Sequence, residues 1–202
     1  MKIVTVLKTS DSFKKEYVDL IYEQCKKFAP SHEFVCISND KRVPGYKQMI
    51  NDFPRWWPKV EMFNIQGPVL YLDIDTVIVK NISTLIQEAS KYEFVCLRDF
   101  YKERLKLERT IGSGVMFWNK DMSYLYQKFM RDPNRHMAEC TTSRWWGDQG
   151  FIEKHHREKP VFWQDILPNK VVSWKEHCKS GVPDSASIIA FHGNPRPWEV
   201  KM

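Results

Sequence analysis

The chain has 202 residues, of which 43% are hydrophobic and 28% charged, and its formal net charge is +6. This composition is ordinary for a globular protein of about one domain, and it excludes a disordered or fibrous chain. The positive charge favours an anionic partner, and a sugar nucleotide or a phosphate satisfies it as well as nucleic acid does. The aromatic fraction of 14%, with 8 Trp, indicates either a bulky core or a cleft that stacks on bases or sugar rings.

Cysteine usage and hydropathy bear on the compartment. The chain has 5 Cys, an odd number with no two close together, which argues against both a disulfide framework and a thiolate zinc site. The apolar run near the start is too short for a signal peptide, and no run approaches the roughly 20 apolar residues of a membrane span. We therefore expect a cytoplasmic protein without a membrane span.

The first elements follow a strand–helix–strand pattern. Residues 3–7 form a continuous apolar run, which predicts a strand buried on both faces. Apolar residues then recur at helical spacing over 13–28, where Asp11 or Ser12 can cap the start, and residues 33–38 predict a second strand. This opening is typical of nucleotide-binding α/β proteins.

The alternation of strands and helices continues to the end of the chain. Pro58 predicts the first turn of a short helix over 59–65, and the strongest strand signal follows at 69–72. The other predicted strands are 94–97, 114–118, 171–172 and 188–191, and the other predicted helices are 123–130 and 148–156. We therefore expect an α/β fold with a mostly parallel central sheet flanked by helices. The charged segment 99–109 is interpreted as a solvated loop or helix rather than a site.

Two carboxylates directly follow the strongest strand. Asp73 and Asp75 end the sequence Leu-Tyr-Leu-Asp-Ile-Asp, and ligands of open α/β sheets bind beyond the carboxyl ends of the strands. Charge beside a buried strand is costly unless a cation or a donor offsets it. Carboxylate oxygens suit Mg²⁺ or Mn²⁺ carrying a diphosphate. The alternative is that one of the two merely caps the following turn.

A second cluster lies near the C-terminus. His192 follows the predicted strand 188–191, and imidazole is a better ligand for Mn²⁺ than for Mg²⁺. Arg196 can hold a phosphate through two parallel hydrogen bonds. A lone His is usually structural, but the neighbouring Arg, Pro and Trp residues favour a ligand role here.

Two further clusters carry weaker signals. Gly112 and Gly114 flank Ser113 and lead into a predicted strand, where glycine lets a ligand approach the backbone closely. Asp148 and Gln149 open a predicted helix just after a Trp pair, Trp145 and Trp146, which suggests a platform for a sugar. Ordinary turns and helix starts give the same patterns.

Taken in chain order, these motifs resemble the GT-A glycosyltransferases, in particular their family 8-like members. The matching series runs from the Asp-x-Asp pair through Ser-Gly-Val and Asp-Gln to His192 and an Arg-Pro-Trp tail. The resemblance covers nearly the whole chain. It extends to small bacterial and large-virus glycosyltransferases, among them polysaccharide-making ones of chlorella viruses. It implies a single domain over 1–202, with a nucleotide-binding half at about 1–98 and a sugar and acceptor half at about 99–202, either alone or as part of a larger multidomain chain.

The resemblance also implies ligands and site residues. Members bind a nucleotide sugar, usually UDP-linked, with Mn²⁺, and act on a glycan or other hydroxyl acceptor; no nucleic acid partner is expected. Asp73, Asp75 and His192 would hold the metal, and Asp148 and Gln149 would face the donor sugar as the catalytic pair. The remaining residues expected to bind the nucleotide sugar are Leu7, Lys8, Thr9, Lys59, Asp73, Ser113, Gly114, Arg196 and Trp198.

One departure from the family affects the sugar. Family 8 enzymes commonly place Asn or Asp and then Ala or Gly before their Gly-Val, whereas this chain has Gly112 and Ser113. The contacts to the sugar are therefore expected to differ from those in family 8 enzymes. The sugar itself is expected to be neither galactose nor glucose. Because family 8 enzymes retain the anomeric configuration, retention is the expected outcome.

Two other functions fit parts of the sequence. Asp73 and Asp75 after an apolar strand also match the nucleophile motif of haloacid-dehalogenase-type phosphatases, which use Mg²⁺. That motif usually ends the first strand, however, and the Pro-Trp tail would have no role. A non-catalytic carbohydrate-binding module or a nucleic-acid binder explains the Trp content and the charge, but it needs no ordered series of metal and phosphate residues.

Overall fold

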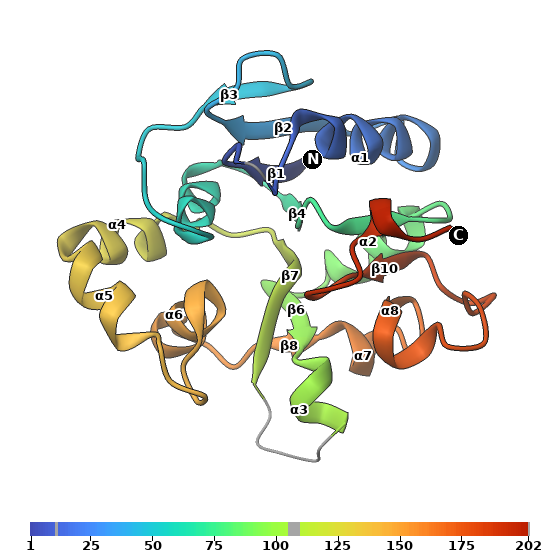
Figure 1. Cartoon of the computed structure of the whole chain (residues 1–202). Helices are drawn as coiled ribbons and strands as arrows, with labels where there is room; N and C mark the ends of the chain where they lie inside the picture. Colours follow the sequence, from blue (N-terminus) through green and yellow to red (C-terminus); the bar gives the residue numbers. More distant parts are fainter. Residues whose placement is uncertain (11, 105–109, 202) are drawn as a thin grey trace.

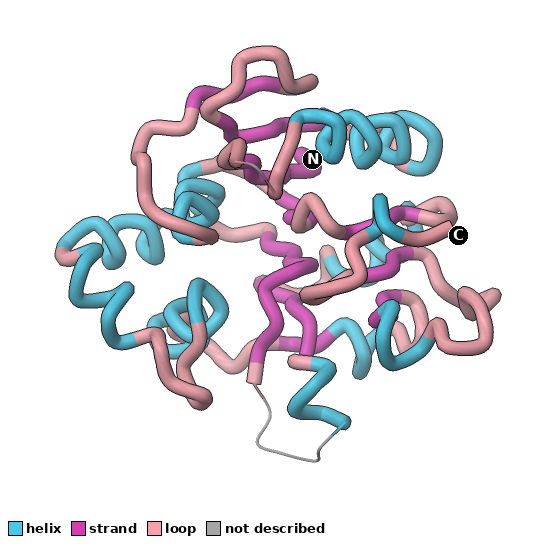
Figure 2. The backbone as a smooth tube through the Cα atoms, in the orientation of Figure 1, coloured by secondary structure: helices cyan, strands magenta, loops and turns pink. Residues whose placement is uncertain are grey.

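The computed structural model describes residues 1–10, 12–104 and 110–201 (Figure 1). Strands occupy the centre of the molecule and helices surround them (Figure 2).

Asp11, one of the two expected caps of the first helix, lies outside the described residues. The helix begins two residues later than Ser12 would place it, with Lys14 as its N-cap and no side-chain cap.

A large sheet of seven strands forms the core, in the order β3-β2-β1-β4-β7-β6-β8. Neighbouring strands are parallel except that β7 runs antiparallel to both β4 and β6. This confirms the expected mixed α/β fold with a mostly parallel sheet. The strands are β1 (Lys2–Leu7), β2 (Glu33–Ser38), β3 (Tyr46–Gln48), β4 (Val69–Leu72), β6 (Phe94–Arg98), β7 (Ile111–Trp118) and β8 (Val161–Phe162).

A second, smaller sheet stands beside the first. It has the order β5-β10-β9, with β5 (Thr76–Ile78) antiparallel and β9 (Val171–Ser173) parallel to β10 (Ile188–Ala190). The sequence pattern did not predict β5, because its three residues directly continue the Asp-x-Asp segment. The pairing of β5 with β10 brings the C-terminal segment next to that segment, since the Phe191 N–H donates to the carbonyl oxygen of Asp75 at 3.2 Å.

The helices complete the layers. They are α1 (Lys15–Phe28), α2 (Ser83–Ala89), α3 (Phe100–Arg104), α4 (Ser123–Arg131), α5 (Pro133–Glu139), α6 (Gly147–His155), α7 (Trp163–Ile166) and α8 (Trp174–His177), with 3-10 helices η1 (Trp57–Asn64) and η2 (Pro197–Glu199). The expected helix at 59–65 is thus a 3-10 helix that begins earlier, with Pro58 in its first turn. Of the charged segment 99–109, the described part contains the short helix α3.

Both faces of the large sheet are buried. Along β4, Val69 and Tyr71 pack with η1, α4 and α6, while Leu70 and Leu72 pack with α1, α2 and the smaller sheet. Side chains alternate between the two faces of a strand, so a strand covered on both sides needs an unbroken apolar run. This is why the strand signal at 69–72 is so strong.

Two other findings bear on the expectations for the compartment. All five cysteines are free and buried. Within residues 1–10, 12–104 and 110–201, every helix is too short or too polar to cross a membrane.

The packing of His155 predicts a loss of stability in acid. Burial and nearby positive charge lower the pKa of His155 from 6.5 to about 4, and its ring packs on His136 and Phe151. The unfolded chain therefore binds this proton more readily, so the stabilisation is complete above about pH 6.5 and is lost as the pH falls towards 4. His155→Phe should lose less stability than the parent between pH 7 and pH 5 in urea denaturation. Identical pH dependence in both proteins would contradict this account.

Candidate functional site

A cavity of about 610 Å³ opens at the carboxyl ends of β1 and β4. Its wall is built from six stretches of the chain that are far apart in sequence: the end of β1 with the loop after it, the start of η1, the segment after β4, the start of β7, the start of α6 and the segment after β10. The lining residues are Val6, Lys8, Thr9, Ser10, Ser12, Phe13, Arg55, Trp56, Pro58, Lys59, Asp73, Ile74, Asp75, Ser113, Trp146, Asp148, Gln149, Phe191, His192, Gly193 and Arg196.

Asp73 stands at the end of β4, where three groups hold it in place. Its backbone N–H donates to the carbonyl oxygen of Gly114 at 2.9 Å. The Tyr71 hydroxyl donates to Asp73 Oδ1 at 2.6 Å, and Lys59 Nζ lies 2.9 Å from the same oxygen. Burial and the Asp73 charge raise the pKa of Tyr71 well above its usual value, so this hydroxyl remains a donor. The orientation of the carboxylate is therefore determined before any ligand arrives.

Lys59 is the buried cation of the site. Its ammonium group lies 2.8 Å from Asp148 Oδ2 and donates to Ser113 Oγ at 3.1 Å, in addition to its contact with Asp73. Burial alone would lower the pKa of Lys59, but the two carboxylates outweigh it and raise the pKa above its usual value. Lys59 is therefore charged. Its contacts with Asp73, Ser113 and Asp148 connect η1 to the end of β4, to β7 and to α6.

The antiparallel strand β7 explains the position of Ser113. Because Leu72 pairs with Val115, the start of β7 extends past the end of β4 into the cavity wall. Sequence analysis expected Gly112 and Ser113 to lead into the strand. They lie within it instead, and the direction of β7 places Ser113 beside Asp73 and Lys59.

Asp75 is buried and pairs with Arg196 of the C-terminal segment. Burial and the negative charge of Asp73 raise the pKa of Asp75 to about 7, although the Arg196 charge opposes this. The buried carboxylate of Asp75 and the partly exposed carboxylate of Asp73 thus repel each other, and the cation beside Asp75 relieves only part of that repulsion. The Arg196 guanidinium also lies over the ring of Phe13, 5.4 Å from its centroid, so the C-terminal segment closes this side of the cavity.

His192 lines the same cavity but turns towards the smaller sheet. Its Nε2 is hydrogen-bonded to Ser173 Oγ at 2.6 Å, and its ring stacks on Phe100 at a centroid distance of 6.0 Å. Burial and the nearby charge of Lys175 lower the pKa of His192. Among the described residues, no group of three His, Cys, Asp or Glu side chains is close enough to hold a metal ion. Asp73 and Asp75 suit a hard divalent cation by their oxygen chemistry and mutual repulsion, whereas His192 is not brought together with them.

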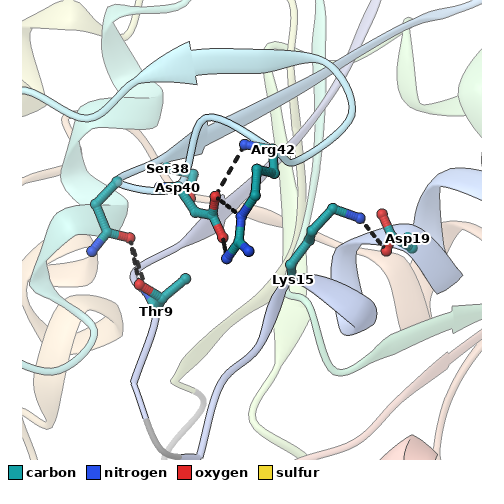
Figure 3. A network of polar contacts seen from close by, with 7 residues as sticks. Thr9, Lys15, Asp19, Ser38, Asp40 and Arg42 are labelled. Carbon is teal, nitrogen blue, oxygen red and sulfur yellow. Dashed lines mark hydrogen bonds and ion pairs between the residues drawn. The ribbon is translucent and has the colours of Figure 1, made fainter.

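The loop after β1 forms another part of the wall. Asn39, which follows β2, accepts hydrogen bonds from both the backbone N–H of Thr9, at 2.9 Å, and its hydroxyl, at 3.1 Å. Figure 3 shows Thr9 beside the turn in which Asp40 accepts hydrogen bonds from Arg42. Lys8 Nζ in turn donates to the carbonyl oxygen of Phe53 at 2.9 Å. The backbone of this loop is therefore tied to its neighbours, while Lys8 and Thr9 line the cavity.

Two tryptophans of the cavity wall, Trp56 at the start of η1 and Trp146 at the start of α6, pack against each other. The rings of Trp56 and Trp146 lie 5.9 Å apart at an angle of 45°. Gly147, between Trp146 and Asp148, has φ of +60°, and a Cβ there would stand 2.6 Å from Trp56 Nε1. Only glycine allows the Trp56 indole to lie so close to the backbone.

Most of the residues expected from the sequence meet in this one cavity. Of the expected set, the cavity is lined by Lys8, Thr9, Lys59, Asp73, Asp75, Ser113, Asp148, Gln149, His192 and Arg196. Leu7 is fully buried in the core, Gly114 contributes its carbonyl to Asp73, and Trp198 stacks on Tyr17 at a centroid distance of 3.5 Å. None of these three lines the cavity.

No local sequence pattern indicated several other lining residues. Phe13 belonged to the apolar pattern of a predicted helix, and Ser12 was expected only as its cap. Arg55 has φ of +54°, an uncommon conformation for a residue with a side chain. Such strain clusters at functional sites, but it becomes visible only in the folded backbone.

Comparison with known proteins identifies the fold. No protein-family model and no curated protein matches the sequence. The galactosyltransferase LgtC, in complex with donor and acceptor sugar analogues, matches with a TM-score of 0.62 at 13% identity, covering 98% of this chain and 89% of that one. The glycosyltransferase GlyE of Streptococcus pneumoniae TIGR4 matches with a TM-score of 0.63 at 11% identity, covering 98% and 55%. The bifunctional WbbM matches with a TM-score of 0.58 at 11% identity, covering 98% and 46%. The chain therefore has the GT-A fold of these glycosyltransferases.

Removing the buried ammonium group should destabilise the protein. Lys59→Met leaves Asp73 and Asp148 without their cation, and an uncompensated buried charge costs about 3–5 kcal/mol. The free energy of unfolding in urea at pH 7 should fall by roughly this amount. Lys47→Met, which removes an exposed lysine from β3, should have little effect. Equal stability of the two variants would contradict the role assigned to Lys59.

The close contact between Trp56 and Gly147 can be tested by substituting two glycines. Gly147 and Gly67 both have positive φ, but a Cβ at Gly67 would meet no atom within 4 Å. Gly67→Ala should cost only the backbone strain, about 1–2 kcal/mol. Gly147→Ala should cost clearly more, because the Trp56 indole must also move. Urea denaturation measures both costs, and similar values would show that the Trp56 contact is unimportant.

Proposed function

We propose that this protein transfers a hexose or deoxyhexose from a UDP-sugar to a hydroxyl group of a glycan or other acceptor. The observation that carries the proposal is the meeting of Asp73, Asp75, Lys59, Arg196 and Asp148 in one cavity. The two cations can face a diphosphate, while the carboxylates can hold a divalent cation or face a neutral sugar. The GT-A fold supports the same reaction class.

The proposed chemistry follows the charge that develops in the reaction. When the bond between sugar and phosphate breaks, negative charge grows on the leaving UDP and positive character grows at the anomeric carbon. The positive charges of Arg196 and Lys59 stabilise the leaving group. Asp148, at the start of α6, stabilises the anomeric carbon or takes the proton of the acceptor hydroxyl. Gln149 lies beside it and donates to Asp99 at 3.3 Å, which orients its amide.

A divalent cation belongs to this proposal. Asp73 and Asp75 would hold Mn²⁺, with Mg²⁺ as the alternative, and the ion would supply further positive charge to the diphosphate. His192 is proposed as the third ligand because it lines the same cavity, and it would have to leave its hydrogen bond with Ser173 to reach the ion. Burial and the Asp73 charge raise the pKa of Asp75, and a cation beside both carboxylates would offset both effects.

The remaining parts of the proposal concern the nucleoside and the biological setting. Lys8 and Thr9 would contact the uracil and ribose, since they line the cavity at the end of β1. Retention of the anomeric configuration follows the family 8 resemblance. A role in polysaccharide biosynthesis in the cytoplasm agrees with that resemblance and with the spread of cysteines along the sequence.

The deciding experiment offers a panel of UDP-sugars with Mn²⁺ and analyses the products. A thermal-shift screen precedes it: UDP with Mn²⁺ should raise the melting temperature, by the equivalent of about 2.7 kcal/mol at a hundredfold excess over the dissociation constant. Stabilisation by vanadate with Mg²⁺, and not by UDP, would favour the phosphatase instead. Sugar binding without UDP binding would favour the non-catalytic module.

Asp148→Asn should separate binding from turnover. The variant keeps the shape of the side chain but removes the charge, so UDP affinity should change little. Transfer and slow hydrolysis of the UDP-sugar should both fall by about 10²- to 10⁴-fold. Asp184→Asn makes the same chemical change at an exposed position outside the cavity and should leave the rate unchanged. Normal turnover in Asp148→Asn would remove this residue from the reaction.

Removal of divalent metal should abolish turnover. The diphosphate would lose its main counter-charge, because Lys59 shares its positive charge with two carboxylates and compensates only part of the charge on the diphosphate. Turnover measured in EDTA should return when Mn²⁺ is added in excess. Undiminished activity in EDTA would show that the two cationic side chains are sufficient.

A further inference from the structure

The charge of Asp75 is compensated from the cavity wall. Within the described part of the chain, the carboxylate of Asp75 forms a single ion pair, with the guanidinium group of Arg196. Asp73 differs, because the buried Lys59 and the Tyr71 hydroxyl hold it from within the fold. The Arg196 side chain is 24% exposed and lines the cavity. Asp75 is therefore neutralised by a group that a ligand can reach.

The backbone on both sides of Arg196 is anchored. Before it, the N–H of Phe191 donates to the carbonyl oxygen of Asp75 at 3.2 Å. After it, the N–H of Arg196 donates to Glu199 Oε2 at 2.7 Å, and the N–H of Glu199 donates back to the Arg196 carbonyl at 3.0 Å. Trp198 then stacks on an aromatic ring of α1 at a centroid distance of 3.5 Å. The guanidinium group can thus change its partner by side-chain rotation, without movement of the segment that carries it.

A divalent cation would meet this guanidinium group at Asp75. In our proposed function Asp73 and Asp75 hold the ion, but Arg196 already contacts Oδ2 of Asp75. Positive groups that share one partly buried carboxylate repel each other, and solvent screens that repulsion only weakly. The ion and Arg196 therefore compete for Asp75.

A diphosphate removes the competition. A guanidinium group binds phosphate oxygens through two parallel hydrogen bonds, and Arg196 lines the cavity that receives the diphosphate in our proposed function. The nucleotide thus offers Arg196 a new anion at the moment when the ion takes Asp75. Each of the two binding events favours the other.

We propose that Arg196 is a charge switch, which neutralises Asp75 in the empty site and moves to the diphosphate when metal and nucleotide bind together. This inference rests on the proposed function and states how its metal is taken up. The protein binds a free divalent cation weakly and binds it tightly only with a nucleotide diphosphate. By linkage, the ion raises the nucleotide affinity by the same factor as the nucleotide raises the affinity for the ion.

Three variants separate the switch from general electrostatics. Arg196→Met removes the guanidinium group from Asp75. Lys8→Met is the matched control, because Lys8 also lines the cavity but pairs with Asp52 instead. Asp75→Asn removes the charge that holds Arg196. Each variant is first checked for a cooperative thermal transition.

The first readout is binding of Mn²⁺ alone, measured by calorimetry without nucleotide. Arg196→Met should bind Mn²⁺ more tightly than the parent by about 5- to 150-fold, the usual range of coupling between two sites. Lys8→Met should gain much less, since its charge acts only through the general field. Equal affinity in Arg196→Met and the parent, or an equal gain in both variants, would overturn the proposal.

The second readout is UDP affinity in EDTA. Asp75→Asn should bind UDP more tightly than the parent, because Arg196 is then free to meet the diphosphate. The same substitution made in Arg196→Met should give a clearly smaller gain, which a double-mutant cycle measures. An equal gain in both backgrounds would overturn the switch.

The third readout follows the Arg196 side chain of the parent protein by NMR. Its Nε–H signal is assigned by its absence from Arg196→Lys, and Mg²⁺ replaces the paramagnetic Mn²⁺. The signal should shift when Mg²⁺ and UDP are added together, and an unchanged signal in the UDP-bound protein would overturn the proposal. Absence of UDP binding to the parent would instead overturn the proposed function, while the Mn²⁺ titration would still decide whether Arg196 competes with the ion.

Discussion

The buried ammonium group of Lys59 is the interaction on which the rest of the site depends. It lies within 2.9 Å of Asp73 and 2.8 Å of Asp148, which come from the end of β4 and the start of α6. Without it, the buried carboxylate of Asp148 would lose the cation that lies beside it, and an unpaired buried charge is costly. Lys59 therefore sets the distance between the end of β4 and the start of α6. In our proposal, the end of β4 holds the diphosphate and the start of α6 faces the sugar.

The architecture also explains how distant segments supply opposite charges to one cavity. The antiparallel direction of β7 brings Ser113 to the carboxyl end of β4. The small sheet does the same for the C-terminus, because the pairing of β5 with β10 carries Arg196 to Asp75. Two strand pairings thus convert an ordinary α/β edge into a site enclosed by cationic and anionic groups.

The cavity has two chemically different parts, and this difference supports a reaction between two substrates. Towards α1, Arg196 and Phe13 combine positive charge with an aromatic ring. Towards α6, Trp146 and Trp56 offer aromatic rings near Asp148, which is paired with Lys59. In our proposal, the first part faces the nucleotide and the second part faces the sugar.

By itself, the sequence determined the features whose signals are local. The apolar run 69–72 became β4 with the expected bounds, because a strand buried on both faces requires such a run, and Asp73 and Asp75 necessarily follow it. The tertiary structure alone decided which distant residues meet. Trp198 stacks on Tyr17 instead of lining the cavity, and Arg196 pairs with a residue 121 positions earlier in the chain. Such contacts depend on strand order and register, which arise from the packing of the whole chain and leave no periodic pattern near either residue.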